Sequence, residues 1–170
     1  SGDLTGGKKT GDVPFATLTT ISESRLSFGL IYTGSDDGNV YLTKDGGANW
    51  QKLGAADKKG VGGLPQGLYV SRVLASQHHR GRVYVTLNGY RNDHFTAYVF
   101  RSEDYGQTWT RLGLDLPVDP VNVIREDPKS DSIIYIGTDG GAFASIDGGN
   151  TFMPFIKGLP RSIPVHDIAI

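Results

Sequence analysis

The sequence predicts an all-β protein assembled from a repeated four-stranded unit. Its 170 residues include 24 glycines, which gather with Asp, Asn and Ser in short clusters typical of tight turns between strands. Short runs of β-branched and aromatic residues, the usual composition of strands, separate these clusters. No stretch shows a convincing 3.6-residue periodicity of the kind that marks an amphipathic helix.

One eight-residue pattern, Ser/Thr-x-Asp-x-Gly-x-x-aromatic, occurs at residues 43–50, 102–109 and 145–152. Its aspartates lie 59 and 43 positions apart. The shorter interval matches a four-stranded propeller blade, which takes roughly 40–50 residues, and the longer interval implies an insertion. The sequence therefore predicts a partial β-propeller of about three four-stranded antiparallel blades plus one strand of a fourth.

The expected boundaries follow from the positions of the repeats and their flanking strands. We expect a flexible N-terminal segment at 1–12, blades at 13–53, 68–115 and 116–158, an inter-blade insertion at 54–67, and the first strand of a further blade at 159–170. The expected strands are 15–21, 30–34, 40–43 and 50–53; 70–75, 83–87, 97–101 and 108–112; and 121–126, 133–137, 142–145 and 151–155. So few blades fall short of the roughly four that ring closure needs. The expected partners are the remaining blades of a longer protein or another copy of this chain.

Each repeat is interpreted as a structural turn between the third and fourth strands of a blade. The Asp carboxylate can accept hydrogen bonds from nearby backbone N–H groups, and the Ser or Thr two positions earlier can donate to it. The aromatic residue can bury against a neighbouring blade, contributing roughly 1.5–3 kcal/mol. The structural residues are Thr43, Asp45, Gly47 and Trp50; Ser102, Asp104, Gly106 and Trp109; and Ser145, Asp147, Gly149 and Phe152. No metal or cofactor is expected, since segment 36–39 lacks the spaced ligands of a calcium loop.

Repeats with these flanks resemble the Asp-box (BNR) β-propellers. That group includes sialidases, xyloglucan-hydrolysing glycosidases, photosystem assembly propellers and the sortilin-type (Vps10) receptor domain. Segments 83–95 and 102–109 most resemble large sortilin-like proteins of bacteria described as glycosyl hydrolases. The resemblance implies an extracytoplasmic location, whether periplasmic, cell-surface or secreted, and the absence of cysteines favours a bacterial source. The resemblance itself says little about activity.

The segment around residues 88–95 is the candidate binding site. Tyr90 and Phe95 could stack on a sugar ring, and Arg91 could clamp a carboxylate or sugar hydroxyls. His94 lies in the same loop, and Asp93 is a weak candidate for a catalytic acid or base. The alternative is that Arg91 and Asp93 pair with each other while Phe95 packs beneath the loop.

The leading hypothesis is a non-catalytic binding or scaffold segment of a larger propeller that presents loops to a protein, peptide or glycan. The alternative is one half of a carbohydrate cleft in a sialidase-like or xyloglucanase-like glycoside hydrolase. A two-carboxylate glycosidase places its carboxylates about 5–10 Å apart, and Asp93 or Asp12 could supply at most one of them. The net charge of −1 argues against a nucleic-acid binder. No apolar run approaches the roughly 18 residues of a membrane span.

Overall fold

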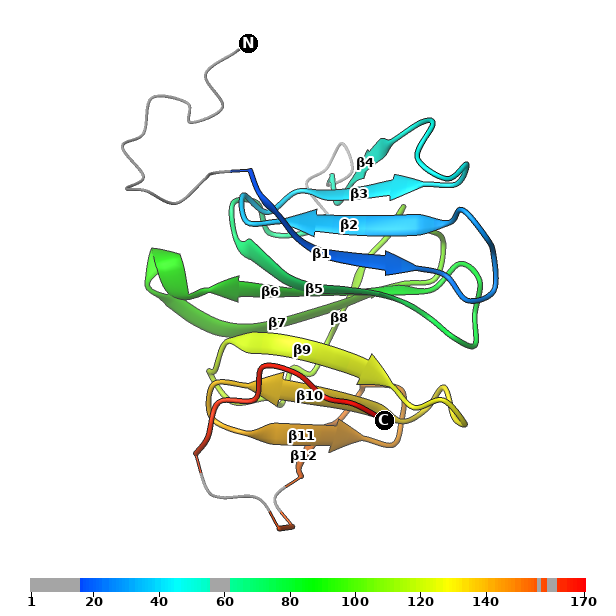
Figure 1. The fold of residues 1–170 in the computed structure, drawn as a ribbon. Coiled ribbons are helices and arrows are strands. Elements are labelled where there is room, and N and C mark those ends of the chain that lie inside the picture. Colours follow the sequence, from blue (N-terminus) through cyan, green and yellow to red (C-terminus); the bar gives the residue numbers. More distant parts are fainter. Residues whose placement is uncertain (1–15, 56–61, 156, 159–161) are drawn as a thin grey trace.

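The computed structural model describes residues 16–55, 62–155, 157–158 and 162–170, and it contains three four-stranded antiparallel sheets (Figure 1). The strands of the first sheet are β1 (Leu18–Glu23), β2 (Ile31–Ser35), β3 (Val40–Thr43) and β4 (Gln51–Leu53). The second sheet has β5 (Tyr69–Ala75), β6 (Val83–Gly89), β7 (His94–Ser102) and β8 (Thr110–Leu112). The third has β9 (Val121–Glu126), β10 (Ile134–Thr138), β11 (Ala142–Ser145) and β12 (Met153–Pro154). The predicted all-β fold of three four-stranded blades is confirmed.

Strand bounds differ from the prediction mainly in the second blade. Strands β6 and β7 extend until Gly89 pairs with His94, so most of the segment between the expected strands at 83–87 and 97–101 belongs to one long hairpin. A single turn of 3-10 helix, η1 (Tyr90–Asn92), closes that hairpin. This 3-10 turn is the helical structure in the described ranges, and no helix there is long and apolar enough to cross a bilayer. The expected segments at 1–12, 54–67 and 159–170 fall wholly or partly outside the described residues.

The blades stack side by side, and the apolar core lies between them (Figure 1). One core cluster joins the first and second sheets, and another joins the second and third. The contact is close at Gly34 in β2, where a Cβ atom would collide with the side chain of Val70 in β5. Glycine at the end of β2 therefore allows the first strand of the next blade to approach the sheet.

Residues 162–170, called here the C-terminal tail, lie along the third sheet (Figure 1). The Val165 N–H donates a hydrogen bond of 2.8 Å to the carbonyl oxygen of Thr138. A Cβ atom on Gly137 would lie 2.6 Å from the Val165 side chain, so Val165 is placed against Gly137 as Val70 is against Gly34. The tail thus takes the position expected for the inner strand of a fourth blade. It makes no strand ladder, because no second strand pairs with it among the described residues.

Candidate functional site

The hairpins of the three blades divide the molecule into two ends. Strands β2, β6 and β10 point the same way (Figure 1), so the hairpins that follow them share one end of the blades. That end, called the loop end, comprises residues 36–39, 90–93 and 139–141. The repeat turns at 44–50, 103–109 and 146–152 follow β3, β7 and β11 and therefore lie at the opposite end.

The three repeat turns share one hydrogen-bond arrangement. In the second turn, Asp104 Oδ1 accepts bonds from the Ser102 hydroxyl at 2.7 Å and from the backbone N–H groups of Gln107 and Thr108 at 3.0 and 2.9 Å. Its Oδ2 accepts a bond from the Thr108 hydroxyl at 2.6 Å. Asp45 and Asp147 accept equivalent bonds within their own turns. Each turn therefore uses the acceptor oxygens of its own Asp carboxylate for hydrogen bonds, which leaves these carboxylates poorly suited to bind a ligand.

These hydrogen bonds make the turns sensitive to acid. The Asn49 side-chain amide lowers the pKa of Asp45 from 3.8 to about 2, and the Thr151 backbone N–H lowers the pKa of Asp147 similarly. A lowered folded-state pKa gives stability that is present above pH ~4 and is lost as the pH falls towards 2. We expect the double variant Asp45→Asn/Asp147→Asn to lose less stability than the wild type between pH 4 and 2 in urea unfolding followed by circular dichroism. Equal losses in the two proteins would contradict this expectation.

The aromatic residues of the repeats pack towards the preceding blade. Trp109 is 8 % exposed and belongs to the core between the first and second sheets. Phe152 packs against the core between the second and third sheets. Trp50, in contrast, is 46 % exposed, so its expected burial is wrong for this chain. The reason is that the described residues contain no blade before the first one for Trp50 to contact.

The loop end holds a cavity of about 300 Å³ that spans the second and third blades and the tail. It is lined by Tyr69, Asn88, Tyr90, Arg91, Asn122, Asp139 and His166. A row of hydrogen bonds crosses it from blade to blade. The Asn88 amide donates to Asn122 Oδ1 at 3.2 Å, and the Asn122 amide donates to Asp139 Oδ1 at 2.8 Å. The Tyr90 N–H donates to Asn88 Oδ1 at 2.9 Å, which fixes the orientation of the first amide.

Arg91 pairs with Asp36 of the first blade, not with Asp93. Its Nη1 atom lies 3.4 Å from Asp36 Oδ2, and its guanidinium lies 5.0 Å from the centre of the Tyr69 ring. Asp93 instead ends the 3-10 turn with φ of 54°, in the left-handed region, and its N–H donates to the Tyr90 carbonyl oxygen. Arg91 therefore connects two blades at the loop end, and the alternative in which Arg91 pairs with Asp93 is wrong.

The predicted binding residues separate into two groups. Tyr90 and Arg91 line the cavity, whereas Asp93, His94 and Phe95 do not. His94 Nε2 lies 3.1 Å from the Thr96 hydroxyl and 3.2 Å from the Tyr98 hydroxyl. The Phe95 ring makes an edge-to-face contact with Tyr90, whose side chain is largely exposed. Asn88 lies at the start of the candidate segment, whereas Tyr69, Asn122, Asp139 and His166 could not be identified from it.

No protein-family model matches the chain. In sequence it is 32 % identical over 138 residues to vacuolar protein sorting/targeting protein 10 of Laccaria bicolor, a match that covers 74 % of this chain and 8 % of the relative. The chain thus spans less than a tenth of the length of that protein.

Several solved structures are similar to this chain in fold, at low sequence identity. The GH74 xyloglucanase of Xanthomonas campestris aligns with a TM-score of 0.62 at 14 % identity over 85 % of this chain and 24 % of its own. The GH74 enzyme of Niastella koreensis gives 0.63 at 15 % identity over 85 % and 23 %. YCF48 bound to D1 peptide gives 0.60 at 16 % identity over 82 % and 40 %. The chain is therefore a section of β-propeller, similar in sequence to a Vps10 sorting protein and in fold to GH74 and YCF48 propellers.

Proposed function

We propose that this chain is a non-catalytic section of a larger extracytoplasmic β-propeller and that its loop end binds a polypeptide ligand. The observation that carries the proposal is the row formed by Asn88, Asn122 and Asp139 across a cavity that spans two blades and the tail. The remaining blades of the ring, or another copy of the chain, are the structural partners in this proposal.

The chemistry of the cavity suits an extended peptide backbone. A side-chain amide both donates and accepts hydrogen bonds, as does each peptide unit. The rings of Tyr69 and Tyr90 add apolar surface beside the amides, and tyrosine gives a large contact area at low cost in conformational entropy. Two loop-end carboxylates are already engaged, Asp36 by Arg91 and Asp139 by Asn122, and the Asp93 side chain does not line the cavity. This arrangement favours a binding role over acid–base catalysis.

The comparisons make a polypeptide the first ligand to test. The relative at 32 % identity is named as a sorting and targeting protein, and one propeller of similar fold was solved with a bound peptide. Neither name assigns a ligand to this chain. Both names concern proteins that act on or bind other polypeptides.

Binding of arrayed random peptides followed by calorimetry of the best binders tests the proposal. Asn122→Ala and Tyr90→Ala should each weaken binding at least tenfold, a loss of about 1.4 kcal/mol, because each removes a group that lines the cavity. Lys129→Ala is the matched control, since Lys129 is exposed in the β9–β10 connection at the opposite end. Peptides that bind all three variants with wild-type affinity would place the site elsewhere and contradict the proposal.

A glycan is the second candidate ligand, favoured by the exposed edge-to-face pair of Tyr90 and Phe95. Aromatic faces pack against sugar rings, and the neighbouring amides could bind sugar hydroxyls. In the same titrations, saturable binding of xyloglucan oligosaccharides, with no peptide binding, would favour this alternative. Hydrolysis of the glycan by the chain, abolished in Asp93→Asn, would overturn the non-catalytic proposal altogether.

A further inference from the structure

The contact between the first and second blades is built from two apolar pairs that pack in one core with a tyrosine. Val70 and Val73 come from the inner strand β5, and Val83 and Val85 come from the second strand β6. They share a core cluster with Tyr32 of the preceding blade. Each of the five side chains is at most 1 % exposed. Both pairs therefore contribute to complete burial of this contact.

The contact between the second and third blades repeats this arrangement position by position. Val121 and Ile124 come from β9, and Ile134 and Ile136 come from β10. They share a cluster with Tyr84, and all five side chains are 0 % exposed. Two blade contacts thus use the same elements: an inner-strand pair spaced by three residues, a second-strand pair spaced by two, and a tyrosine opposite them.

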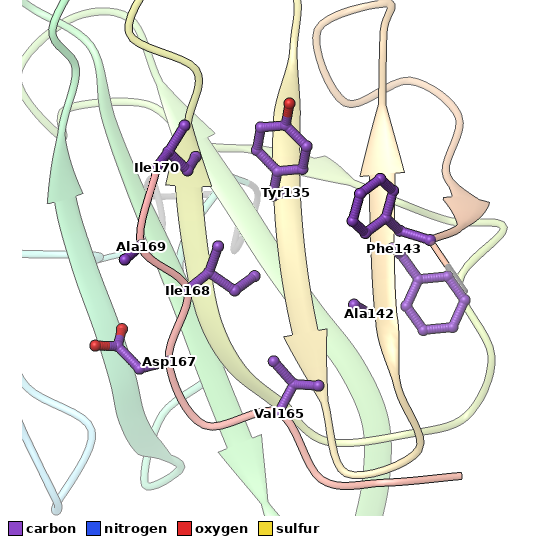
Figure 2. A pocket seen from close by; sticks show the side chains of 9 residues that line it. Tyr135, Ala142, Phe143, Val165, Asp167, Ile168, Ala169 and Ile170 are labelled. Carbon is purple, nitrogen blue, oxygen red and sulfur yellow. The ribbon is translucent and has the colours of Figure 1, made fainter. Parts of the chain in front are cut away.

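The third blade and the tail repeat only half of this arrangement. Tyr135 in β10 is equivalent to Tyr32 and Tyr84, and Val165 and Ile168 in the tail have the spacing of Val121 and Ile124. Figure 2 shows the side chains of Val165 and Ile168 directed to the same side as Tyr135 and Ala142. Tyr135, Val165 and Ile168 are only partly buried. The inner-strand pair is in place, and the described residues supply no second-strand pair.

Polar contacts hold the tail in an extended conformation beside the sheet. Arg125 Nε donates to the Ile168 carbonyl oxygen at 2.9 Å, and Arg125 Nη2 lies 2.7 Å from Asp167 Oδ1. Arg72 Nη2 contacts the same carboxylate oxygen at 3.1 Å. Exposed ion pairs contribute little stability on their own, but these two arginines reach Asp167 from the inner strands of two blades. They fix the tail in the inner-strand position.

A cavity of about 420 Å³ lies where the second-strand pair would sit (Figure 2). Its lining is mostly apolar and includes Tyr135, Ala142, Phe155, Val165, Ile168 and Ile170. Phe155 makes an edge-to-face contact with Tyr135 across a centroid distance of 6.1 Å. An open apolar cavity bordered by an extended segment without a ladder partner is the usual setting for addition of a strand.

We propose that this surface, formed by the tail and the exposed face of the third sheet, binds the second strand of a further propeller blade. The partner is an extended segment that runs antiparallel to the tail and carries two aliphatic side chains at alternate positions. In the established contact, Ile136 pairs with Ile124 and Ile134 pairs with Glu126. Transferred to the tail, this register places the two aliphatic residues opposite Ile168 and Ile170. The proposal rests on the part of the proposed function that makes the chain a section of a larger propeller, and it is independent of any ligand at the loop end.

The chain itself supplies the probe, a fluorescein-labelled peptide of residues 131–139 that contains the β10 sequence. Fluorescence anisotropy with the full chain should show saturable binding. Ile168→Asp should weaken it at least tenfold, because it places a charge in the apolar cavity. Gln51→Asp is the matched control and should change the affinity less than twofold, since it adds the same charge at an exposed residue of β4 in the first blade, which does not line the cavity. A peptide with serine at both positions equivalent to Ile134 and Ile136 should not bind, and this arm leaves the protein unaltered.

Hydrogen–deuterium exchange locates the bound peptide. Protection is expected over residues 164–170 and not over β1 to β4. Three results would overturn the proposal: no saturable binding, equal binding to the wild type and Ile168→Asp, or protection confined to the first blade. A fourth would do so as well, namely concentration-dependent dimerisation by light scattering that Ile168→Asp abolishes while the peptide fails to bind. That result would identify a second copy of the chain as the occupant.

Discussion

Replacing Trp109 with alanine will lower the free energy of unfolding by about 3–5 kcal/mol, the usual cost of removing a large buried aromatic side chain. Trp109 follows β7 and inserts into the core that joins the first and second blades. Its turn also lies close to the first blade, since a Cβ atom added to Gly106 would collide with the Leu53 side chain. The indole N–H has no hydrogen-bond partner among the residues that the structure describes, so the loss is one of packing and buried area.

Trp50 provides the control for this experiment within the same repeat. It occupies the equivalent position in the first blade but is half exposed, so Trp50→Ala should change the stability by less than about 1 kcal/mol. Urea unfolding of both variants measures the difference directly, with fluorescence of the remaining tryptophan and circular dichroism as independent probes. Equal destabilisation by the two substitutions would show that the aromatic position acts within its own turn and not between blades.

Glu126→Ala should be comparably damaging, with an expected loss of about 3–5 kcal/mol from breaking a buried charged network. The Glu126 carboxylate is 1 % exposed at the end of β9. It accepts hydrogen bonds from the Ser76 hydroxyl at 2.8 Å, the Gln77 N–H at 2.7 Å and the Tyr84 hydroxyl at 3.0 Å. All three donors belong to the second blade, so one carboxylate from the third blade satisfies them together. Alanine would leave these donors buried without a partner.

Glu103→Ala is the matched control for the Glu126 prediction. Glu103 pairs with Arg82 and Arg101 at 2.9 Å, but its side chain is 51 % exposed, so its loss should cost less than about 1 kcal/mol. Glu126→Gln keeps the side-chain volume but replaces one acceptor oxygen with a donor, and it should fall between the two. Thermal unfolding followed by calorimetry ranks the three variants. A Glu126→Ala protein as stable as Glu103→Ala would refute the proposed role of the network.

The fold could be predicted from the sequence because its signal is local and repeated. Each repeat encodes its turn within eight consecutive residues, and each flank encodes its strands by composition. The apolar pairs that join the blades carry a weaker signal. Val70 and Val73 lie three positions apart, as do Val121 and Ile124, because each inner strand has a register irregularity near its start. An extra residue of this kind breaks the period of two by which a strand is recognised.

The candidate site was only partly predictable, since its residues meet only when the blades stack. Tyr90 and Arg91 were identified because they lie in one unusual segment of the sequence. Asn122 and Asp139 come from β9 and the β10–β11 hairpin, and His166 comes from the tail. The pairing of Arg91 with Asp36 joins residues 55 positions apart, which no short motif reveals.

The glycine at the end of β2 has a consequence for the curvature of the assembly. At Gly34 the next blade can come close because glycine has no Cβ atom to collide with Val70. Gly137 makes the same kind of close contact with Val165 of the tail. These two glycines therefore set the spacing between neighbouring inner strands. A side chain added at either position would push the neighbouring strand away and change the angle between the blade and its neighbour. The spacing of the strands at these two contacts thus depends on two residues that carry no side chain.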